Sequence, residues 1–320
     1  MKNTSTIKEF IFLGFPKLPS LQTAMFYMSF TFYTATLIGN SLIIIATIVD
    51  NRLHVPMYFF LSNLAFLDIV YTTVTIPKML LNFLWKSNTI SFYACATQMY
   101  FFIAFGSIEC TLLAVMAYDR YVAICLPLNY VILMETITCI TLVFSSWISG
   151  FLNSMIHTVL TFHLPYCSSN KINQFFCDIP PLLKVACANT LINKIVLFTV
   201  GGIYGLGSFL LTLISYTYII STILKIRSKE GQRKSFSTCA SHLIVVTLFY
   251  GTSFFMYLQT TYQSSMELQK LIPVLYTVVT PTLNPIIYTL RNQEFKSVLK
   301  KMIEKNLTHK KRITSEYKLC

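Results

Sequence analysis

Charged side chains are rare in this chain, and a few of them are candidates for chemistry. In "MAYDRYVAIC" the acid Asp119 directly precedes the base Arg120, at the end of a long apolar run. Asp68 and Glu109 each lie inside a long apolar run that contains no other acid. If such runs cross a membrane, an internal carboxylate costs roughly 2.5 to 3.5 kcal/mol, so it should face the protein interior and have a partner.

The two internal acids are expected at similar depth. Glu109 lies ten residues before Asp119, about 15 Å along a helix. Asp68 lies twelve residues after Pro56, roughly 18 Å from the same side. We expect Asp68 and Glu109 to share a cation or a proton, since two adjacent carboxylates cannot both stay ionised without compensation. The alternative is two separately hydrogen-bonded carboxylic acids that hold helices together.

The chain lacks the residue patterns of an enzyme. Its five histidines are dispersed, and it has no metal-ligand spacing, no Gly-rich phosphate loop and no serine with a suitable base and acid. We therefore predict neither catalysis nor a cofactor. Paired inverted halves and ion-lining charges in several helices, which are typical of transporters and channels, are also absent from the sequence.

The elements that position these residues are predicted to be transmembrane helices. The chain is 54% hydrophobic and only 12% charged, which indicates an integral membrane protein. A helix needs roughly 20 apolar residues to cross the bilayer, and seven segments are long enough: about 24 to 49, 57 to 84, 95 to 118, 138 to 162, 194 to 224, 238 to 262 and 271 to 290. Continuous runs exclude a barrel, whose strands alternate.

We therefore predict an all-α membrane protein, a seven-transmembrane helix bundle with a short C-terminal amphipathic helix. The expected parts are an N-terminal segment at 1–23, a seven-transmembrane domain at 24–291 and a C-terminal helix and tail at 292–320. The amphipathic helix is expected from Arg291 to Glu304, with an apolar side and a lysine side. Pro281 and Pro285 should kink the seventh helix and free backbone carbonyls that Asn284 or water could satisfy.

Basic residues set the orientation. Lysine and arginine collect in the segment from Lys225 to Lys234 and in the tail after Arg291, so both should be cytoplasmic and the N-terminus outside. The net charge of +13 then reflects topology and attraction to anionic lipid, and not nucleic-acid binding. Asn3 begins a glycosylation sequon on the outer side.

Four cysteines are expected in the oxidising outer compartment. Cys95, Cys167, Cys177 and Cys187 lie at the outer end of the third span or in the loop after the fourth. They indicate two disulfides, and spacing alone leaves three connectivities open.

Two helix faces are predicted to line a mostly apolar pocket. Phe102, Phe105 and Gly106 precede Glu109 by seven, four and three residues and share its face. The sixth helix has a comparable face, formed by Tyr250, Ser253, Phe254 and Tyr257. Ordinary packing between helices is the alternative for each of these residues.

Taken together, the motifs resemble those of rhodopsin-like G-protein-coupled receptors, and among these the olfactory receptors. The general features are Asn40 in "GN", Asp68 in "LAFLD", Cys95, "DRY" at Asp119 to Tyr121, and "NPIIY" at Asn284 to Tyr288. Those closer to olfactory receptors are "PMYFFLSNLAFLD", "MAYDRYVAIC", "SY", "RKSFSTCASH" and "PTLNPIIYTLRN". The resemblance covers essentially the whole chain.

The resemblance implies roles for these residues. Arg120 would be held by Asp119 at rest and released on activation toward Tyr216, Tyr288 and the G protein, with Tyr121 and Asn284 in the same machinery. The family pattern pairs Cys95 with Cys177 and Cys167 with Cys187. Asp68 and Glu109 match a midmembrane acidic pair near which many related receptors bind sodium.

The resemblance also implies the function. We expect a receptor in the plasma membrane of olfactory cilia that binds an odorant and, through a stimulatory olfactory-type G protein, raises cyclic AMP. The sixth helix has Phe249-Tyr250-Gly251 in place of a tryptophan and proline toggle, and Phe102 stands where an amine receptor would place an aspartate. A small neutral volatile is therefore expected. The alternatives are a receptor of the same fold for a metabolite outside the nose, and a transporter or channel.

Overall fold

The structure is a computed structural model, and it describes residues 7–14, 18–85, 87–167, 170–261, 275–291 and 295–301. Its elements, in chain order, are β1 (Glu9–Phe12), α1 (Pro19–Val49), η1 (Asn51–Leu53), α2 (Pro56–Trp85), β2 (Thr89–Ser91), α3 (Phe92–Cys125), η2 (Pro127–Asn129), α4 (Tyr130–Leu133), α5 (Thr136–Phe162), β3 (Lys171–Ile172), α6 (Ile179–Val185), α7 (Leu191–Gly202), η3 (Ile203–Gly207), α8 (Ser208–Leu224), α9 (Lys229–Thr261), η4 (Leu275–Val279) and α11 (Thr280–Arg291). Residues 295–301 are also helical.

The protein is an all-α membrane protein, as the sequence predicts. Among the residues that the structure describes, five helical segments are long and apolar enough to cross a bilayer: α1, α2, α3, α5 and the continuous run from α7 to α8. The apolar part of α9, Cys239–Phe254, is shorter, and η4 with α11 follows it in the chain. Large apolar side chains such as Phe144 and Met155 on α5 are more than half exposed, as expected of side chains that meet lipid.

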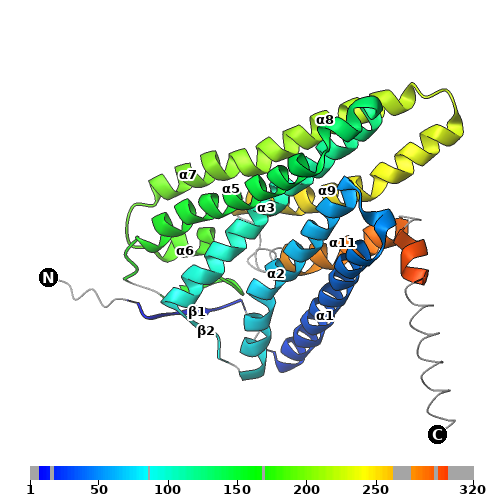
Figure 1. Ribbon diagram of the computed structural model, residues 1–320. Coiled ribbons are helices and arrows are strands. Elements are labelled where there is room, and N and C mark those ends of the chain that lie inside the picture. The colour runs from blue at the N-terminus through cyan, green and yellow to red at the C-terminus, as the bar shows by residue number, and fades with distance from the viewer. Residues whose placement is uncertain are drawn as a thin grey trace, which may run out of the picture.

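The helices pack lengthwise into one bundle, with α3 against α2, α5 and α8 (Figure 1). One end carries β1, β2 and α6, and we call it the disulfide end. The other end carries Asp119, Arg120 and the short helix α4, and we call it the ion-pair end. Because α3 runs from β2 to α4, it connects the two.

A small sheet closes part of the disulfide end. Its strand order is β2-β1-β3, with β1 antiparallel to β2 and parallel to β3. Phe10 and Phe12 of β1 are fully or almost fully buried, and the Phe10 ring meets the Tyr166 ring edge to face at 5.3 Å. The segment before α1 is thus hydrogen-bonded to the loops that contain β2 and β3.

The helices differ from the predicted spans mainly at their ends. α1 begins at Pro19, earlier than 24, and α3 runs from Phe92 to Cys125. α9 begins at Lys229, so part of the basic segment predicted as a loop is helical. Backbone hydrogen bonding continues past the membrane boundary, which hydrophobicity alone cannot detect. The segment 295–301 has Phe295 and Val298 buried and its lysines exposed, as an amphipathic helix requires.

The seventh span is continuous around Pro285, and its freed carbonyl has a different partner from the one predicted. Pro285 cannot donate to the carbonyl of Pro281, four residues earlier. That carbonyl accepts a hydrogen bond from the Asn40 amide of α1 at 3.3 Å. The close approach depends on Gly39, since a Cβ there would come within 2.9 Å of Pro285. Asn284 instead bonds Asp68, so Asn40 and not Asn284 satisfies the carbonyl of Pro281.

Candidate ligand cavity and ion-pair switch

A cavity of about 130 Å³ lies between α3, α5, α6, the α7–η3 segment and α9. Its walls are mostly apolar, as is typical of small-molecule sites. The residues that line it are Tyr71, Phe102, Ile103, Gly106, Ser107, Cys110, Asn153, His157, Asp178, Ile179, Pro180, Leu197, Gly201, Tyr204, Gly205, Phe249, Tyr250, Ser253 and Phe254.

An irregular stretch of helix supplies one wall. The span that contains α7 and α8 is interrupted by the π-helical turn η3, which includes Tyr204 and Gly205. Such turns are frequent at functional sites because they displace side chains from the regular helical register. A Cβ at Gly205 would meet no atom within 4 Å, so the glycine leaves open space there.

Most of the predicted pocket residues line the cavity. Phe102 and Gly106 do so on α3, as do Tyr250, Ser253 and Phe254 on α9. The side chain of Tyr257 lies outside the described residues.

Phe105 is a correction, because it does not line the cavity. Its ring packs against Trp147 and Phe151 of α5, with centroid separations of 6.1 and 6.2 Å. The lining face of α3 is rotated by about one residue from the predicted one, toward Ser107 and Cys110. The spacing from Glu109 defines a helix face but not its centre.

Sequence reasoning missed several polar members of the lining, and four of them lie outside α2 and α3. Asn153 and His157 lie on α5, Asp178 precedes α6, and Tyr204 belongs to η3. A signal existed for the first two, which are four residues apart in an apolar span and therefore share a face. No sequence pattern could have brought Asp178 to the cavity, since the disulfide to Cys95 places it there.

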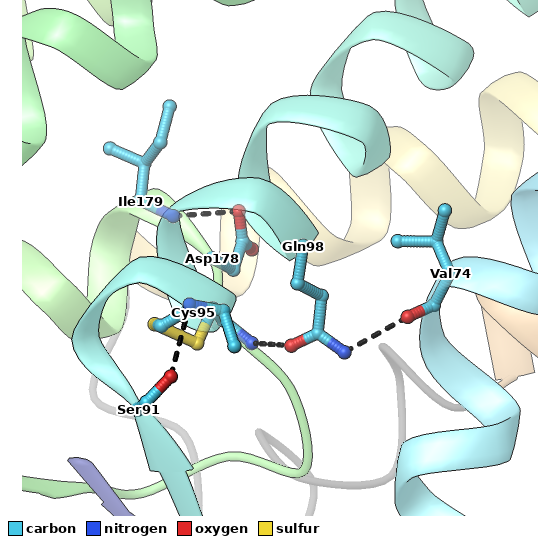
Figure 2. Close-up of a disulfide and its surroundings, with 8 residues drawn as sticks. Val74, Ser91, Cys95, Gln98, Asp178 and Ile179 are labelled. Atoms are coloured by element: carbon cyan, nitrogen blue, oxygen red, sulfur yellow. Dashed lines mark hydrogen bonds between the residues drawn. A yellow bond between two sulfur atoms is a disulfide. The ribbon is translucent and has the colours of Figure 1, made fainter. Parts of the chain in front are cut away.

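The described cysteines form two disulfides, Cys95–Cys177 and Cys167–Cys187, the pairing that the family resemblance implies. The first ties the start of α3 to the segment before α6, as Figure 2 shows. Asp178, Ile179 and Pro180, which follow Cys177, line the cavity. The covalent bond therefore fixes one wall of the cavity to α3.

Gln98 provides a second tie beside that disulfide (Figure 2). Its Oε1 accepts from the Cys177 backbone N–H at 3.0 Å, and its Nε2 donates to the Val74 carbonyl at 3.0 Å. Val74 lies one turn before Pro77, which is inside α2. Proline has no N–H to donate and its ring disturbs the hydrogen bonding of the carbonyls in the preceding turn. The buried amide thus connects α2, α3 and the segment before α6.

Asp178 begins α6 and is almost completely buried. Its Oδ1 accepts from the Ile179 backbone N–H at 2.8 Å, as a helix cap does. Burial raises the pKa of Asp178 to about 6, and the hydrogen bond from Ile179 opposes this only in part. A carboxylic acid with such a pKa changes charge close to physiological pH.

At the ion-pair end, Asp119 holds Arg120 through charged hydrogen bonds. The Arg120 Nε and Nη2 atoms donate to Asp119 Oδ2 at 2.9 and 2.5 Å. The other carboxylate oxygen accepts from the Tyr130 hydroxyl of α4 at 2.9 Å. The Asp119 side chain is fully buried and that of Arg120 is 12% exposed, so the pair is largely shielded from solvent. Sequence reasoning did not identify Tyr130.

The other predicted switch residues are nearby but are not bonded to Arg120 in this conformation. The Tyr216 hydroxyl of α8 bonds His242 Nδ1 of α9 at 2.8 Å. The Tyr288 hydroxyl is buried without a hydrogen-bond partner among the described residues. Tyr121 makes a ring contact with Tyr218, with centroids 5.9 Å apart. His242 lies in the "RKSFSTCASH" motif, but no sequence pattern predicts that it bonds Tyr216.

Asp68 and Glu109 are both buried in the middle of the bundle. Asp68 accepts from the Asn284 amide with both oxygens, at 3.2 and 3.0 Å. Glu109 interacts electrostatically with Asp68, and its Oε1 has no hydrogen-bond partner among the described residues. Such an atom is suited to a proton or a hard cation. The described part of the chain contains no cluster of three or more His, Cys, Asp or Glu side chains of the kind that binds transition metals.

The chain is similar to known proteins over nearly its whole length. Residues 29–306 match the profile of the olfactory receptor family. Olfactory receptor 8U9 of Mus musculus is 50% identical over 94% of this chain and 96% of that protein. Olfactory receptor 1G1 of Gorilla gorilla gorilla is 50% identical over the same shares. Olfactory receptor 5I1 of Homo sapiens is 47% identical, again over 94% and 96%.

Proposed function

The chain belongs to the olfactory receptor family, whose members are odorant-sensing G-protein-coupled receptors and not enzymes, and we propose that it binds a small volatile in the cavity and activates a stimulatory olfactory-type G protein. The resulting signal is a rise in cyclic AMP. The proposed ligand is uncharged, because the cavity walls are mostly apolar.

One observation carries the proposal: a single helix, α3, lines the cavity and carries the intact ion pair. Gly106 lines the cavity and Arg120 belongs to the pair. They are fourteen residues apart, which is about 21 Å along a helix. Tyr250 of α9 lines the same cavity, and His242 of α9 bonds Tyr216 near the other end. A ligand that changes the packing of α3 against α9 therefore acts on both contacts of the switch.

The proposed mechanism is a shift between two conformations. In the resting one, Asp119 holds Arg120 and His242 holds Tyr216. In the active one, α9 moves outward, Tyr216 leaves His242, and Arg120 turns toward Tyr216, Tyr288 and the G protein. A ligand drives this change only by the difference between its affinities for the two conformations.

The acidic pair is the proposed site of a sodium ion or a shared proton. Oxygen ligands suit a hard cation, and Asp68 and Glu109 would hold it beside Asn284. Without a bound cation or proton, two neighbouring buried carboxylates cannot both stay ionised. Thermal stability tests this part of the proposal. Sodium chloride should raise the melting temperature more than choline chloride does, and Glu109→Gln should remove the difference.

The proposed orientation puts the N-terminus outside the cell, together with Asn3 and its glycan. The basic segment from Lys225 and the tail then face the cytoplasm and its anionic lipid. We assign residues 1–23 to the extracellular part, 24–291 to the receptor domain and 292–320 to the cytoplasmic tail. The proposed location is the ciliary membrane of olfactory sensory neurons.

A cyclic AMP reporter assay on cells that display the receptor tests the signalling. Wild type and Arg120→Ala are compared at equal surface display across a broad panel of volatiles. We expect at least one volatile to raise cyclic AMP in wild type and none to do so in Arg120→Ala. Silence of the wild type at good display, with every volatile, contradicts the proposal. An equal response in Arg120→Ala contradicts the role of the pair.

A further inference from the structure

One part of the cavity wall is polar, and we call it the polar pole. Two of its polar atoms, Asn153 Oδ1 and His157 Nε2, have no hydrogen-bond partner from the described residues. Both side chains line the cavity, and each residue is only 3% exposed. They lie four residues apart on α5 and therefore on the same face. Buried polar atoms without partners destabilise a protein, so these two are suited to partners that a ligand supplies.

Neighbouring hydrogen bonds fix the orientation of the Asn153 amide. The Ser107 hydroxyl donates its only proton to the Ile103 carbonyl at 2.8 Å. The Ser107 oxygen can therefore only accept from Asn153, whose Nδ2 lies 2.7 Å away. If the amide were flipped, two acceptors would face each other. Asn153 Oδ1 is consequently an acceptor without a donor.

Four hydroxyl groups around the cavity do not supply that donor, because their protons are already committed. They donate to backbone carbonyls, namely Ser107 to Ile103, Tyr204 to Ser149, Tyr250 to Cys110 and Ser253 to Phe249. The Asp178 Oδ1 atom is itself an acceptor. These committed groups leave Asn153 Oδ1 in need of a hydrogen-bond donor.

We propose that the cavity selects small neutral volatiles that carry a hydroxyl group, which donates to Asn153 Oδ1 and accepts from His157 Nε2–H. This inference rests on the proposed function and names the ligand class of the same site. Ketones, aldehydes and ethers can accept from His157 but cannot donate to Asn153. The size of the ligand follows from the cavity of about 130 Å³, since a cavity of about 150 Å³ holds benzene. Phenol and cyclohexanol are of this size.

Ligand binding can be measured apart from signalling. Purified full-length receptor in detergent is heated with cyclohexanol, cyclohexanone, methylcyclohexane or cyclohexylamine, which share one ring. A ligand that binds the folded protein raises its melting temperature in proportion to the logarithm of its concentration. We expect half-maximal stabilisation by cyclohexanol at a concentration about tenfold or more below that of cyclohexanone. Phenol and anisole form a second pair, with the same order expected.

Two substitutions and two matched controls assign the selectivity to the polar pole. Asn153→Leu keeps the side-chain size but removes the acceptor, so the preference for cyclohexanol should fall to about twofold or less. His157→Phe should weaken cyclohexanol and cyclohexanone alike, because both use that nitrogen. Met155→Leu changes a lipid-facing residue of the same helix, and His163→Phe changes an exposed histidine at its end. Both controls should keep the wild-type preference.

Each outcome bears on one proposal. Equal stabilisation by cyclohexanol and cyclohexanone, strongest stabilisation by cyclohexylamine, stabilisation by none of the probes, or an unchanged preference in Asn153→Leu would overturn the hydroxyl proposal. A variant that does not fold leaves the wild-type order of the probes as the deciding result. The cyclic AMP assay is run with the same compounds. Selective binding without any cyclic AMP response would contradict the signalling function and leave the ligand class standing.

Discussion

The two ends of the bundle are held by different kinds of interaction. At the disulfide end, two disulfides, a three-stranded sheet and the Gln98 amide fix the loops over the cavity. At the ion-pair end, the polar contacts of the described residues are hydrogen bonds and salt bridges, among them Asp119 to Arg120 and Tyr216 to His242. The difference supports the proposal that the disulfide end keeps its geometry while the ion-pair end exchanges partners, because hydrogen bonds and salt bridges break more easily than disulfides.

Of the changes that test this difference between the two ends, removal of the Cys95–Cys177 disulfide should have the largest effect. Cys177→Ser leaves Cys95 without a partner and should lower the free energy of unfolding by about 2 to 5 kcal/mol. Thermal unfolding and surface display measure the loss. Cys139→Ser is the matched control, because Cys139 is a buried free cysteine near the ion-pair end. If Cys177→Ser melts like wild type, the covalent tie is not what holds the disulfide end.

Substitution of Gln98 should separate the hydrogen-bonded tie from the covalent one. Gln98→Leu leaves the Cys177 N–H and the Val74 carbonyl unsatisfied, at a cost of about 1 to 3 kcal/mol. Gln98→Glu keeps an acceptor for Cys177 but cannot donate to Val74. It should retain ligand sensitivity better than Gln98→Leu does.

The Gln98 experiment compares ligand dose-response curves and melting temperatures at equal display. Thr97→Val, at the neighbouring exposed position of α3, should match wild type in both. An unchanged dose-response curve in Gln98→Leu would show that the disulfide alone places the cavity wall.

Asp178 should make the stability of the disulfide end depend on pH. Burial raises its pKa from 3.8 to about 6, so the folded protein binds this proton more tightly than the unfolded chain does. The stabilising contribution is complete below pH 3.8 and is lost as the pH rises through about 6, up to about 3 kcal/mol in total.

Thermal unfolding across that pH range measures this contribution. Wild type should lose more stability between about pH 4 and pH 7 than Asp178→Asn, whose side chain does not titrate. Asp50, which caps η1, provides a control as Asp50→Asn, because its pKa is lowered to about 2 and it should not contribute in the same window. Parallel pH curves for wild type and Asp178→Asn would exclude Asp178 as the source.

Substitution of Tyr130 should have the smallest effect of these changes. It tests whether several weak contacts hold the ion-pair end together. Tyr130→Phe removes one hydrogen bond to Asp119, worth about 0.5 to 1.5 kcal/mol. If that bond favours the resting conformation, basal cyclic AMP should rise by about twofold to tenfold. Tyr118→Phe on α3 is the control and should leave basal signalling unchanged. A fall in basal signalling would mean that Tyr130 supports the active conformation instead.

Much of the fold could be predicted from the sequence because it depends on local composition. Apolar runs of sufficient length must form helices in a bilayer, where every backbone polar group needs an internal partner. The same reasoning placed Asp68 and Glu109 in the interior, where the structure buries both. Helix ends were less predictable, as the start of α9 at Lys229 illustrates, because hydrogen bonding continues beyond the apolar residues.

Only the tertiary structure decided which side chains meet across helices. Helical periodicity defines a face but not its rotation, so Phe105 was assigned to the cavity although it packs on Trp147. The carbonyl freed by Pro285 is satisfied by Asn40 from the far end of the chain, a pairing that no local pattern encodes. The unsatisfied acceptor of Asn153 exists only because Ser107 has already committed its proton. Composition determines what enters the membrane, whereas the packing of distant helices determines which polar atoms remain free for a ligand.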